Sequence, residues 1–441
     1  MGLEEMNSLK SHSRKAMHSL NRGWYGQLLF LLLFSGPPKF RIRDPESSLY
    51  GEVDWVVILH LLVWGAAGLW LLWHIVRWIR TKRGFSALTT SAKLAILLGC
   101  CLLLSAQLSG YQSLVLFKSY QFLVCVVFTA VFTNEYGIER TLRLIFWGSF
   151  SLCALISLAA IWMPDMVWVQ SELETGRLRG DLLAQTGVVA TLALISLFLV
   201  SRNNSKWIEW VAIGFLLSLL GLSLMRTSYV VLILVSFVTL WMNPRFKHRR
   251  LATLLGAVCI ALLSAGTLLR QLSEYRTSEG IWTLSDRLGL WAYLTGVTLT
   301  KSPWFGLGYY SASRIYAPDY NEGLGTAHSM FIELLVGGGL VSLLLFFLVC
   351  ALMTYQTIRL ARKRPRLMDI TAVSLFVACF AFGFVGSDID SGPVGVTFWS
   401  LSSILVALCG SSTIRVKPSH NLLEPLRYPA GHRNSELAGE A

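Results

Sequence analysis

The fold of this chain is decided by one stretch, 329-SMFIELLVGGGLVSLLLFFLVCALMTY-355, in which Glu333 is the single charged residue. A block of about 17 to 25 apolar residues has the length needed to cross a hydrocarbon core of about 30 Å as a helix. Strands of a membrane barrel would instead alternate apolar and polar residues. The continuous pattern therefore predicts a transmembrane helix.

Similar blocks recur along the 441 residues, of which 54% are hydrophobic and only 14% are charged. A soluble globular protein carries about 25% charged residues, so the composition predicts an integral membrane protein. The expected fold class is all-α, a polytopic transmembrane helix bundle of about 12 spans. The expected spans are 24–36, 55–79, 92–109, 113–132, 142–163, 182–200, 207–223, 227–242, 252–269, 329–355, 369–386 and 393–410. The first block is short enough that a signal-peptide core is an alternative to a span.

Basic residues predict the orientation, because cytoplasmic loops are enriched in lysine and arginine. With the N-terminus in the cytoplasm, about 26 Lys and Arg fall inside and about 12 outside. Both termini are then cytoplasmic, and this asymmetry accounts for the net charge of +13 without a nucleic acid partner. The expected divisions are spans 1–9 in residues 1–269, an extracytoplasmic segment 270–327, spans 10–12 in residues 328–410, and a cytoplasmic tail 411–441.

The extracytoplasmic segment 270–327 is the longest expected loop. Long loops are usually functional or disordered, and its richness in Trp, Tyr and Leu argues against disorder. Apolar residues recur at helical spacing from Ile281 to Val297, which predicts an amphipathic helix at the outer interface. This helix is expected to stop near Ser302, because proline at position 303 disfavours helix in the residue before it.

Three arginines on the outer side are informative, because the topology does not require positive charge there. Arg179 precedes the sixth span, Arg226 interrupts an apolar stretch, and Arg287 lies in the predicted loop helix. Burying Arg226 at the bilayer centre would cost several kcal/mol, so we expect a tight outer turn that separates two spans. Each arginine has a simpler interpretation, in which it reaches lipid headgroups or pairs with Asp181 or Asp286. Together they predict an anion site, since a guanidinium offers a planar fork of donors to phosphate oxygens.

His328 stands where the outer loop reaches the tenth span. Such a histidine can be structural, or it can accept a proton from a hydroxyl group near neutral pH. Glu333 is a second candidate, because an acidic group inside a span is costly, although it lies five positions on and off the face of His328. The glycine run 337–339 predicts a bend or close helix packing within this span.

No metal and no cofactor are expected. The sequence lacks a Walker loop, a dinucleotide fingerprint, an H-E-x-x-H motif and a G-x-S-x-G elbow, and no outer cluster of carboxylates suits a divalent metal. The eight cysteines all fall inside apolar blocks without ligand spacing, which predicts buried small hydrophobic residues. They are Cys100, Cys101, Cys125, Cys153, Cys259, Cys350, Cys379 and Cys409.

The order of these parts resembles the O-antigen ligase and polymerase superfamily of bacterial envelope enzymes, over residues 175–355. The resembling motifs are Arg179-Gly180, Arg226-Thr227, Asp286-Arg287, Pro303-Trp304-Phe305-Gly306-Leu307-Gly308-Tyr309 and Ala327-His328-Ser329. Two positions depart from the family, which often has Asn where this chain has Ser329 and Gln185. Both substitutes keep hydrogen-bonding capacity, and they leave the choice between ligase and polymerase open.

The resemblance implies a GT-C-like bundle and a metal-independent, inverting glycosyltransferase at the periplasmic face of the bacterial inner membrane. The donor would be a polyprenyl diphosphate-linked glycan, and the acceptor hydroxyl would lie on lipid A core in a ligase or on another lipid-linked unit in a polymerase. The implied site residues are Arg179, Arg226 and Arg287 for the diphosphate and His328 for catalysis, with Glu333, Ser329 and Gln185 as secondary candidates.

Two other classes of protein remain as alternatives to an enzyme. A polysaccharide-related transporter or flippase would be expected to show inverted repeats and ionisable groups near the bilayer midplane, whereas those of this chain gather at the outer edge. A non-catalytic assembly protein would need neither the arginines nor His328 for its role.

Overall fold

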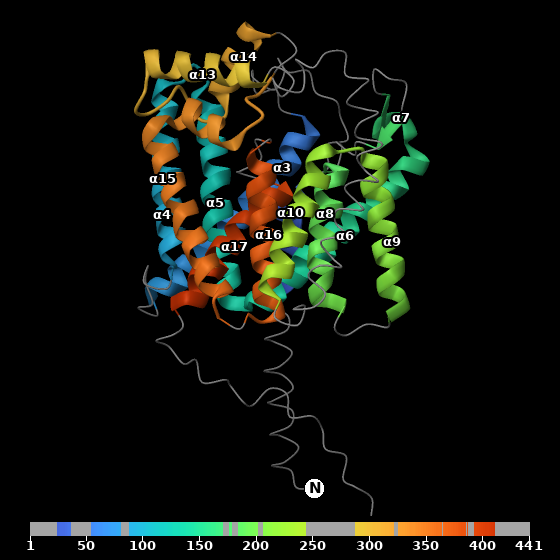
Figure 1. The fold of residues 1–441 in the computed structure, drawn as a ribbon. Coiled ribbons are helices and arrows are strands. Elements are labelled where there is room, and N and C mark those ends of the chain that lie inside the picture. The colour runs from blue at the N-terminus through green and yellow to red at the C-terminus, as the bar shows by residue number, and fades with distance from the viewer. Residues whose placement is uncertain are drawn as a thin grey trace, which may run out of the picture.

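The computed structural model of this chain describes residues 24–36, 54–80, 88–170, 176–178, 184–201, 206–243, 287–321, 325–363, 365–384, 386 and 392–410. The described part is mostly helical. Figure 1 shows the long helices standing side by side in a bundle, with the helices α13 (Arg287–Lys301) and α14 (Ser311–Tyr320) lying at one end of it. We call this end the α13 end.

In the part of the chain that the structure describes, six helices are long and apolar enough to cross a membrane. They are α3 (Trp55–Arg80), α4 (Thr90–Leu104) continued by the 3-10 helix η2 (Ser105–Leu108), α5 (Gln112–Tyr136), α6 (Ile138–Trp162), α15 (Met330–Ala361) and α16 (Leu367–Phe384). Shorter apolar helices lie beside them: Trp24–Ser35, α8 (Thr186–Val200), α9 (Lys206–Ser223), α10 (Arg226–Met242) and α17 (Gly392–Gly410). Each coincides with an expected span, but the span expected at 252–269 lies outside the described residues, so the total of about 12 stays a prediction.

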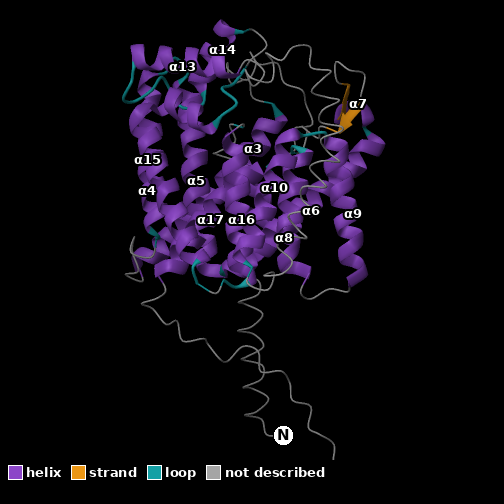
Figure 2. Ribbon diagram, viewed as in Figure 1, coloured by secondary structure: helices purple, strands orange, loops and turns teal. Residues whose placement is uncertain are grey.

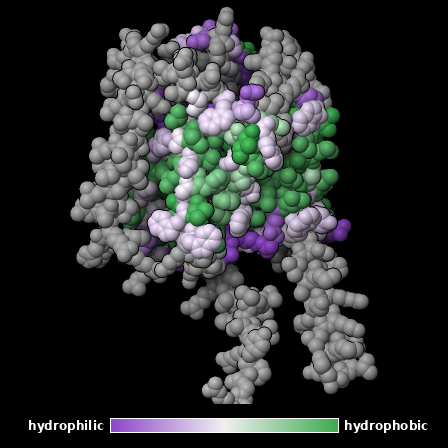
Figure 3. All heavy atoms as spheres, turned by 90° about the vertical axis from the view of Figure 1, so that its right-hand side faces the viewer, coloured by the Kyte–Doolittle hydropathy of each residue, from purple (hydrophilic) through white to green (hydrophobic). Residues whose placement is uncertain are grey.

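The outside of the bundle carries many large apolar side chains. On the face that includes α9, they form an apolar band with polar residues toward its two ends (Figure 3). Trp210 on α9 is 71% exposed and Ile161 on α6 is 73% exposed. Exposing apolar surface to water costs about 25 cal/mol per Å², so a band of this kind is suited to lipid chains. The prediction of a helical, multi-pass membrane protein is confirmed.

The turn between α9 and α10 separates two helices at Arg226, as the sequence predicts. Helix α9 ends at Ser223 and α10 begins at Arg226. Leu224 has a left-handed φ of 49°, and its N–H donates to the carbonyl of Gly221 at 3.3 Å. The turn places the guanidinium at a helix end and not in the middle of a span, where it would be costly.

Helix α15 is broken at Gly339, where φ is 71° and ψ is −172°. The segment 302–310, which we call the docked loop, approaches this break so closely that a Cβ on Gly306 would lie 2.5 Å from the carbonyl carbon of Gly337. The break leaves backbone N–H and C=O groups of α15 without partners inside the helix, and the docked loop forms hydrogen bonds with them. In an interior of low polarity, backbone groups without hydrogen bonds would be costly. The four hydrogen bonds run from Leu307 N to Val336 O (2.8 Å), Gly308 N to Gly337 O (3.1 Å), Leu340 N to Pro303 O (2.8 Å) and Val341 N to Trp304 O (3.2 Å).

The docked loop is also tied to the helices beside α15. Tyr309 is 2% exposed, and its N–H donates to Ser105 Oγ at 3.1 Å. Its ring meets Phe122 of α5 edge-on, with centroids 6.3 Å apart. Ser311 Oγ at the start of α14 shares a hydrogen bond of 2.8 Å with Ser109 Oγ. The loop is therefore a packed part of the bundle, and the glycine run predicted to allow a bend or close packing does both.

Substituting alanine for Gly306 is expected to destabilise the protein by at least about 1–3 kcal/mol. The added Cβ would meet backbone atoms of Gly337, and the φ of 71° at Gly306 is one that L side chains rarely adopt. Thermal unfolding in detergent measures the effect. Gly296→Ala on α13 is the matched control, because its Cβ would meet open space and alanine favours helix by up to about 1 kcal/mol. Equal unfolding temperatures for the two variants would contradict this account of the break.

Four of the described elements at the α13 end were not predicted from sequence. Between α6 and α8, α7 (Pro164–Val167) leads into β1 (Trp168–Gln170), which pairs antiparallel with β2 (Gly176–Leu178), and this hairpin is the strand drawn in Figure 2. Helix α14 follows the docked loop. Helix α13 ends at Lys301, next to the predicted stop, while residues 281–286 lie outside the described part. Its position at a membrane interface stays a prediction.

Candidate active site

Helices α13 and α14 are fixed on the N-terminal part of α15 by a small apolar cluster. It contains Leu290 and Leu294 of α13, Ala312 and Ala317 of α14, and Val336 of α15, together with the buried Ala327. The spacing of four residues between Leu290 and Leu294 puts both side chains on one face of α13. The residue that follows Ala327 is His328, so this cluster lies beside the predicted catalytic position.

The backbone around His328 is held from both sides. Trp291 Nε1 of α13 donates to the carbonyl of Ala327 at 2.7 Å, and the N–H of Ala327 donates to Glu333 Oε1 at 3.1 Å. His328 itself has a left-handed φ of 52°, which costs about 1–3 kcal/mol in a residue other than glycine. The two hydrogen bonds on Ala327 therefore stabilise a conformation that the chain would not adopt by preference.

Glu333 joins three parts of the site. Its carboxylate is buried, with the residue 3% exposed, and both of its oxygens lie 2.8 Å from Ser313 Oγ of α14. Because Oε1 also accepts from Ala327, the side chain links α14, α15 and the peptide before His328. Glu333 therefore stabilises the relative positions of α14, α15 and the backbone that leads to His328.

Replacing Glu333 with glutamine is expected to lower the stability of the protein by about 1–3 kcal/mol, because a buried network loses an acceptor and gains a competing donor. The amide NH₂ replaces one of the two carboxylate oxygens that lie 2.8 Å from Ser313 Oγ. The remaining carbonyl oxygen is uncharged, so its hydrogen bonds from Ser313 and Ala327 are weaker than those to a carboxylate. Thermal unfolding of the purified protein tests this. Glu139→Gln on α6 is the matched control, because Glu139 is 57% exposed and such surface changes stay within about 0.5 kcal/mol. Matching unfolding temperatures for the two variants would refute the role of Glu333.

Two arginines lie close to His328. Burial lowers the pKa of the His328 imidazole below its usual 6.5, and the positive charges of Arg287 and Arg314 lower it further. Arg287 is the first residue of α13 and is half-buried; burial lowers its pKa as well, but a guanidinium remains protonated at physiological pH. The structure therefore places a neutral imidazole among fixed positive charges.

Tyr310 orients one of these arginines. The guanidinium carbon of Arg314 lies 3.3 Å from the centroid of the Tyr310 ring, and Arg314 Nη1 donates to the Tyr310 carbonyl at 2.8 Å. Lys118 of α5 places its Nζ 4.1 Å from the same centroid. Such cation–π contacts are worth about 0.5–2 kcal/mol each. Sequence reasoning missed Arg314 and Lys118, although the rule that outer cations are informative applies to Arg314 directly.

The imidazole of His328 has a defined orientation. Its Nδ1 lies 3.3 Å from Thr326 Oγ1, and within the described residues its Nε2 makes no hydrogen bond. When Nδ1 carries the proton and donates it to Thr326, Nε2 becomes an acceptor. An acceptor nitrogen beside two guanidinium groups can take a proton from a hydroxyl while an anion is held by the cations.

The turn that carries Arg226 meets the N-terminus of α8. Gln185 is the N-cap of α8, and its exposed side chain makes no capping hydrogen bond. Two residues on, a Cβ added to Gly187 would lie 2.5 Å from Ser228 Oγ and 2.8 Å from Met225 Cβ. The structure thus brings the predicted residues Gln185 and Arg226 into one neighbourhood.

Helix α16 contacts both α13, which lies beside His328, and α10, which begins at Arg226. Its last residue, Phe384, meets Trp291 of α13 with ring centroids 6.1 Å apart. Further down, Ser374 Oγ and Thr239 Oγ1 of α10 share a hydrogen bond of 2.8 Å. With a rise of 1.5 Å per residue, Arg226 lies about 20 Å from that bond along α10, and Phe384 about 15 Å along α16. Helix α10 begins and helix α16 ends at the α13 end of the bundle (Figure 1), so Arg226 and the His328 group lie at the same end of the bundle.

The remaining predicted residues have different positions. Ser329 is the N-cap of α15 and is 2% exposed, and its carbonyl accepts from the N–H of Glu333 at 2.9 Å. It therefore lies beneath the site and supports the first turn of α15. Arg179 lies outside the described residues, so its relation to the other arginines stays a prediction.

The fold and this geometry define a class, a multi-pass helical membrane protein with a cationic, histidine-containing site at one end of its bundle. Residues 211–347 match the family model described as O-antigen ligase. The match includes Arg226, Arg287 and His328, and it supports the assignment of the chain to the O-antigen ligase superfamily of membrane glycosyltransferases, which confirms the resemblance found in the motifs. No curated protein matches this chain.

Proposed function

We propose that this protein is a membrane glycosyltransferase of the O-antigen ligase type, which moves a glycan from a polyprenyl diphosphate carrier to an acceptor hydroxyl in cell-surface polysaccharide assembly. It acts at the periplasmic face of the bacterial inner membrane, with both termini in the cytoplasm, and uses no metal. The observation that supports this most is the position of His328, whose Nδ1 lies 3.3 Å from Thr326 Oγ1 and which lies close enough to Arg287 and Arg314 for their charges to lower the pKa of its imidazole.

In the proposed reaction, the acceptor oxygen attacks the anomeric carbon of the donor sugar. The bond from this carbon to the diphosphate oxygen breaks with inversion, and the acceptor proton passes to Nε2 of His328. Arg287 and Arg314 stabilise the negative charge that develops on the leaving diphosphate, and Arg226 binds the same diphosphate from the turn before α10. We expect Arg179 to join this group. The bound diphosphate offsets the arginine charges, so the pKa of His328 rises when the donor binds and proton transfer becomes easier.

A polymerase of the same superfamily is the nearest alternative, because the geometry of the site fits either acceptor. The lipid-linked glycans of a deletion strain separate the two. Accumulation of finished polymer on the lipid carrier supports a ligase, whereas accumulation of single repeat units supports a polymerase.

Proteins of other classes give different results with purified protein. A transferase consumes the lipid-linked glycan and releases polyprenyl diphosphate without moving solute across a vesicle membrane. A transporter or flippase moves its substrate across the membrane and leaves the lipid-linked glycan intact. If the protein were a non-catalytic assembly protein, the variants Arg226→Ala and His328→Ala would leave the surface glycan of the cell unchanged.

A further inference from the structure

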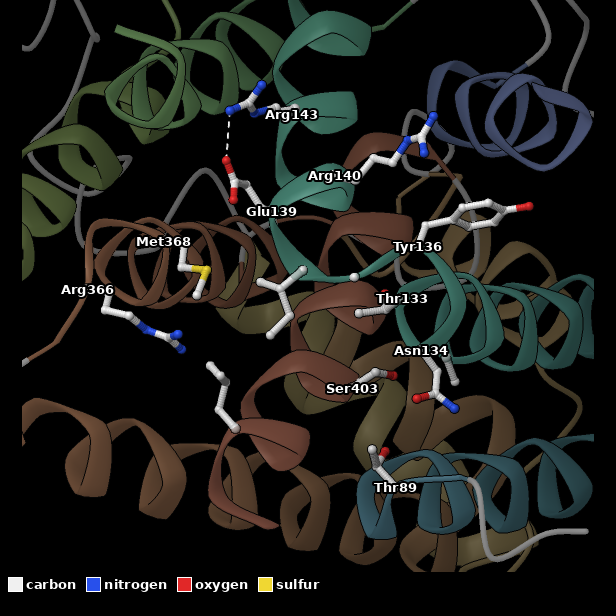
Figure 4. Close-up of a pocket in the computed structure, with 14 residues that line it drawn as sticks. Thr89, Thr133, Asn134, Tyr136, Glu139, Arg140, Arg143, Arg366, Met368 and Ser403 are labelled. Carbon is white, nitrogen blue, oxygen red and sulfur yellow. Dashed lines mark hydrogen bonds and ion pairs between the residues drawn. The ribbon is translucent and has the colours of Figure 1, made fainter. Parts of the chain in front are cut away.

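A cavity of about 910 Å³ opens at the end of the bundle opposite to His328. The described residues that line it come from five places: the N-cap of α4, the last part of α5, the start of α6, the start of α16 with the residue before it, and the second half of α17. Figure 4 shows polar side chains from these elements arranged around one opening. This cavity plays no part in the proposed reaction.

The lining of the cavity has a cationic rim and an apolar wall. Three arginines contribute to it, Arg140 and Arg143 from α6 and Arg366 from the segment before α16. The wall between them includes Ala130, Ile138, Met368 and Leu408. A free inorganic anion would use the rim alone, whereas a molecule with an anionic headgroup and acyl chains would use the rim and the wall together.

The arginines of the rim keep donors for a ligand. Arg143 Nη2 pairs with Glu139 Oε1 at 2.7 Å, and Arg366 Nε and Nη2 contact Asp369 at 3.2 and 3.4 Å. A guanidinium has five N–H donors, so these bonds leave several unused on each side chain. Among the residues that the structure describes, no carboxylate forms an ion pair with Arg140. In Figure 4, Arg366 and the Arg143–Glu139 pair lie on one side of the opening and Arg140 extends to the other.

One buried hydroxyl in the wall is further evidence for a ligand in this cavity. Thr133 lines the cavity and is 6% exposed, yet its Oγ1 has no hydrogen-bond partner within the described part of the chain. Leaving a buried polar atom without a partner is unfavourable. A headgroup oxygen in the cavity would provide the partner after a rotation about the Cα–Cβ bond of Thr133.

We propose that this cavity binds the phosphate headgroup of an anionic phospholipid, with the acyl chains lying along the apolar helices beside it. The cationic rim binds the phosphodiester, and the apolar wall meets the glycerol end of the chains. Basic pockets between membrane helices bind anionic headgroups by this combination of contacts.

The test measures lipid binding by the full-length protein in nanodiscs or mixed micelles. Phosphatidylglycerol is expected to raise the unfolding temperature and to remain bound in native mass spectra, while phosphatidylcholine and inorganic phosphate do neither. The double variant Arg143→Gln/Arg366→Gln should weaken phosphatidylglycerol binding by about tenfold or more, since each cation near an anionic headgroup contributes a several-fold factor. Arg362→Gln is the matched control, because Arg362 is an exposed arginine next to α15 that does not line the cavity.

The variant Thr133→Val separates binding from folding. Removing a hydroxyl that has no partner should leave the lipid-free protein at least as stable as the wild type, while phosphatidylglycerol binding weakens. Equal phosphatidylglycerol binding by the wild type and the double arginine variant would overturn the proposal. Stabilisation by inorganic phosphate alone, equal to that by phosphatidylglycerol, would overturn it as well.

Discussion

Replacing His328 with alanine is expected to slow glycan transfer by about 10²–10⁴-fold, which is the range for the loss of a general base. The acceptor hydroxyl would then have to transfer its proton to water from within a site lined by arginines. The measurement is the rate at which purified protein consumes a lipid-linked glycan at saturating acceptor. Insertion and thermal unfolding should remain close to those of the wild type, because Ala327 and Glu333 keep their hydrogen bonds.

His328→Asn distinguishes the chemistry from the conformation. His328 has a φ of 52°, a region that asparagine tolerates better than most residues, so this variant should fold at least as well as His328→Ala. Asparagine still offers an amide for hydrogen bonding but cannot accept a proton at neutral pH. If His328→Asn kept wild-type transfer, His328 would only position the acceptor and the proposed base would be wrong.

The pH dependence follows from the direction of the His328 pKa shift. Only the neutral imidazole accepts a proton, so activity falls as the pH drops through this pKa. In the free enzyme the pKa lies below the usual 6.5, and the acidic limb of kcat/KM should therefore lie below that pH. A bound diphosphate offsets the arginines and raises the pKa, so the acidic limb of kcat should lie at higher pH than that of kcat/KM.

Much of the fold follows from the sequence, because the length of an apolar run is itself the physical requirement for crossing a membrane. The turn at Arg226 was predictable for the same reason, since burying a guanidinium at mid-bilayer is costly. The break in α15 was signalled by the glycine run, although the insertion of the docked loop into it was not. Which segment fills a break depends on packing between residues distant in sequence.

The candidate site was harder to predict. Helix α14 buries Ser311, Ala312, Ser313 and Ala317 and contains Pro318, so it lacks the apolar periodicity that identifies a helix. Without that helix, nothing in the sequence placed Arg314 next to His328. The role of Glu333 was also hidden, because its partners Ser313 and Ala327 come from segments whose approach is set by tertiary structure.

Replacing Arg287 with glutamine is expected to lower kcat by about 10²–10³-fold, the effect of removing one group that stabilises charge in a transition state. The guanidinium of Arg287 is half-buried beside His328, where its charge is screened less than on an open surface. Arg287→Lys should recover part of the rate, because it keeps the charge but loses the planar fork of donors. Transfer assays with purified variants measure both effects.

The pH profile of the transfer reaction distinguishes a catalytic role of Arg287 from a purely structural one. Removing the charge of Arg287 should raise the pKa of His328, so the acidic limb of kcat/KM for Arg287→Gln should move to higher pH than in the wild type. Arg177→Gln is the matched control, since Arg177 is an exposed arginine in β2 at the same end of the bundle and should change neither the rate nor the limb. An Arg287→Gln protein with lower stability, a reduced rate and an unmoved acidic limb would show that this arginine supports the fold and does not act on the diphosphate.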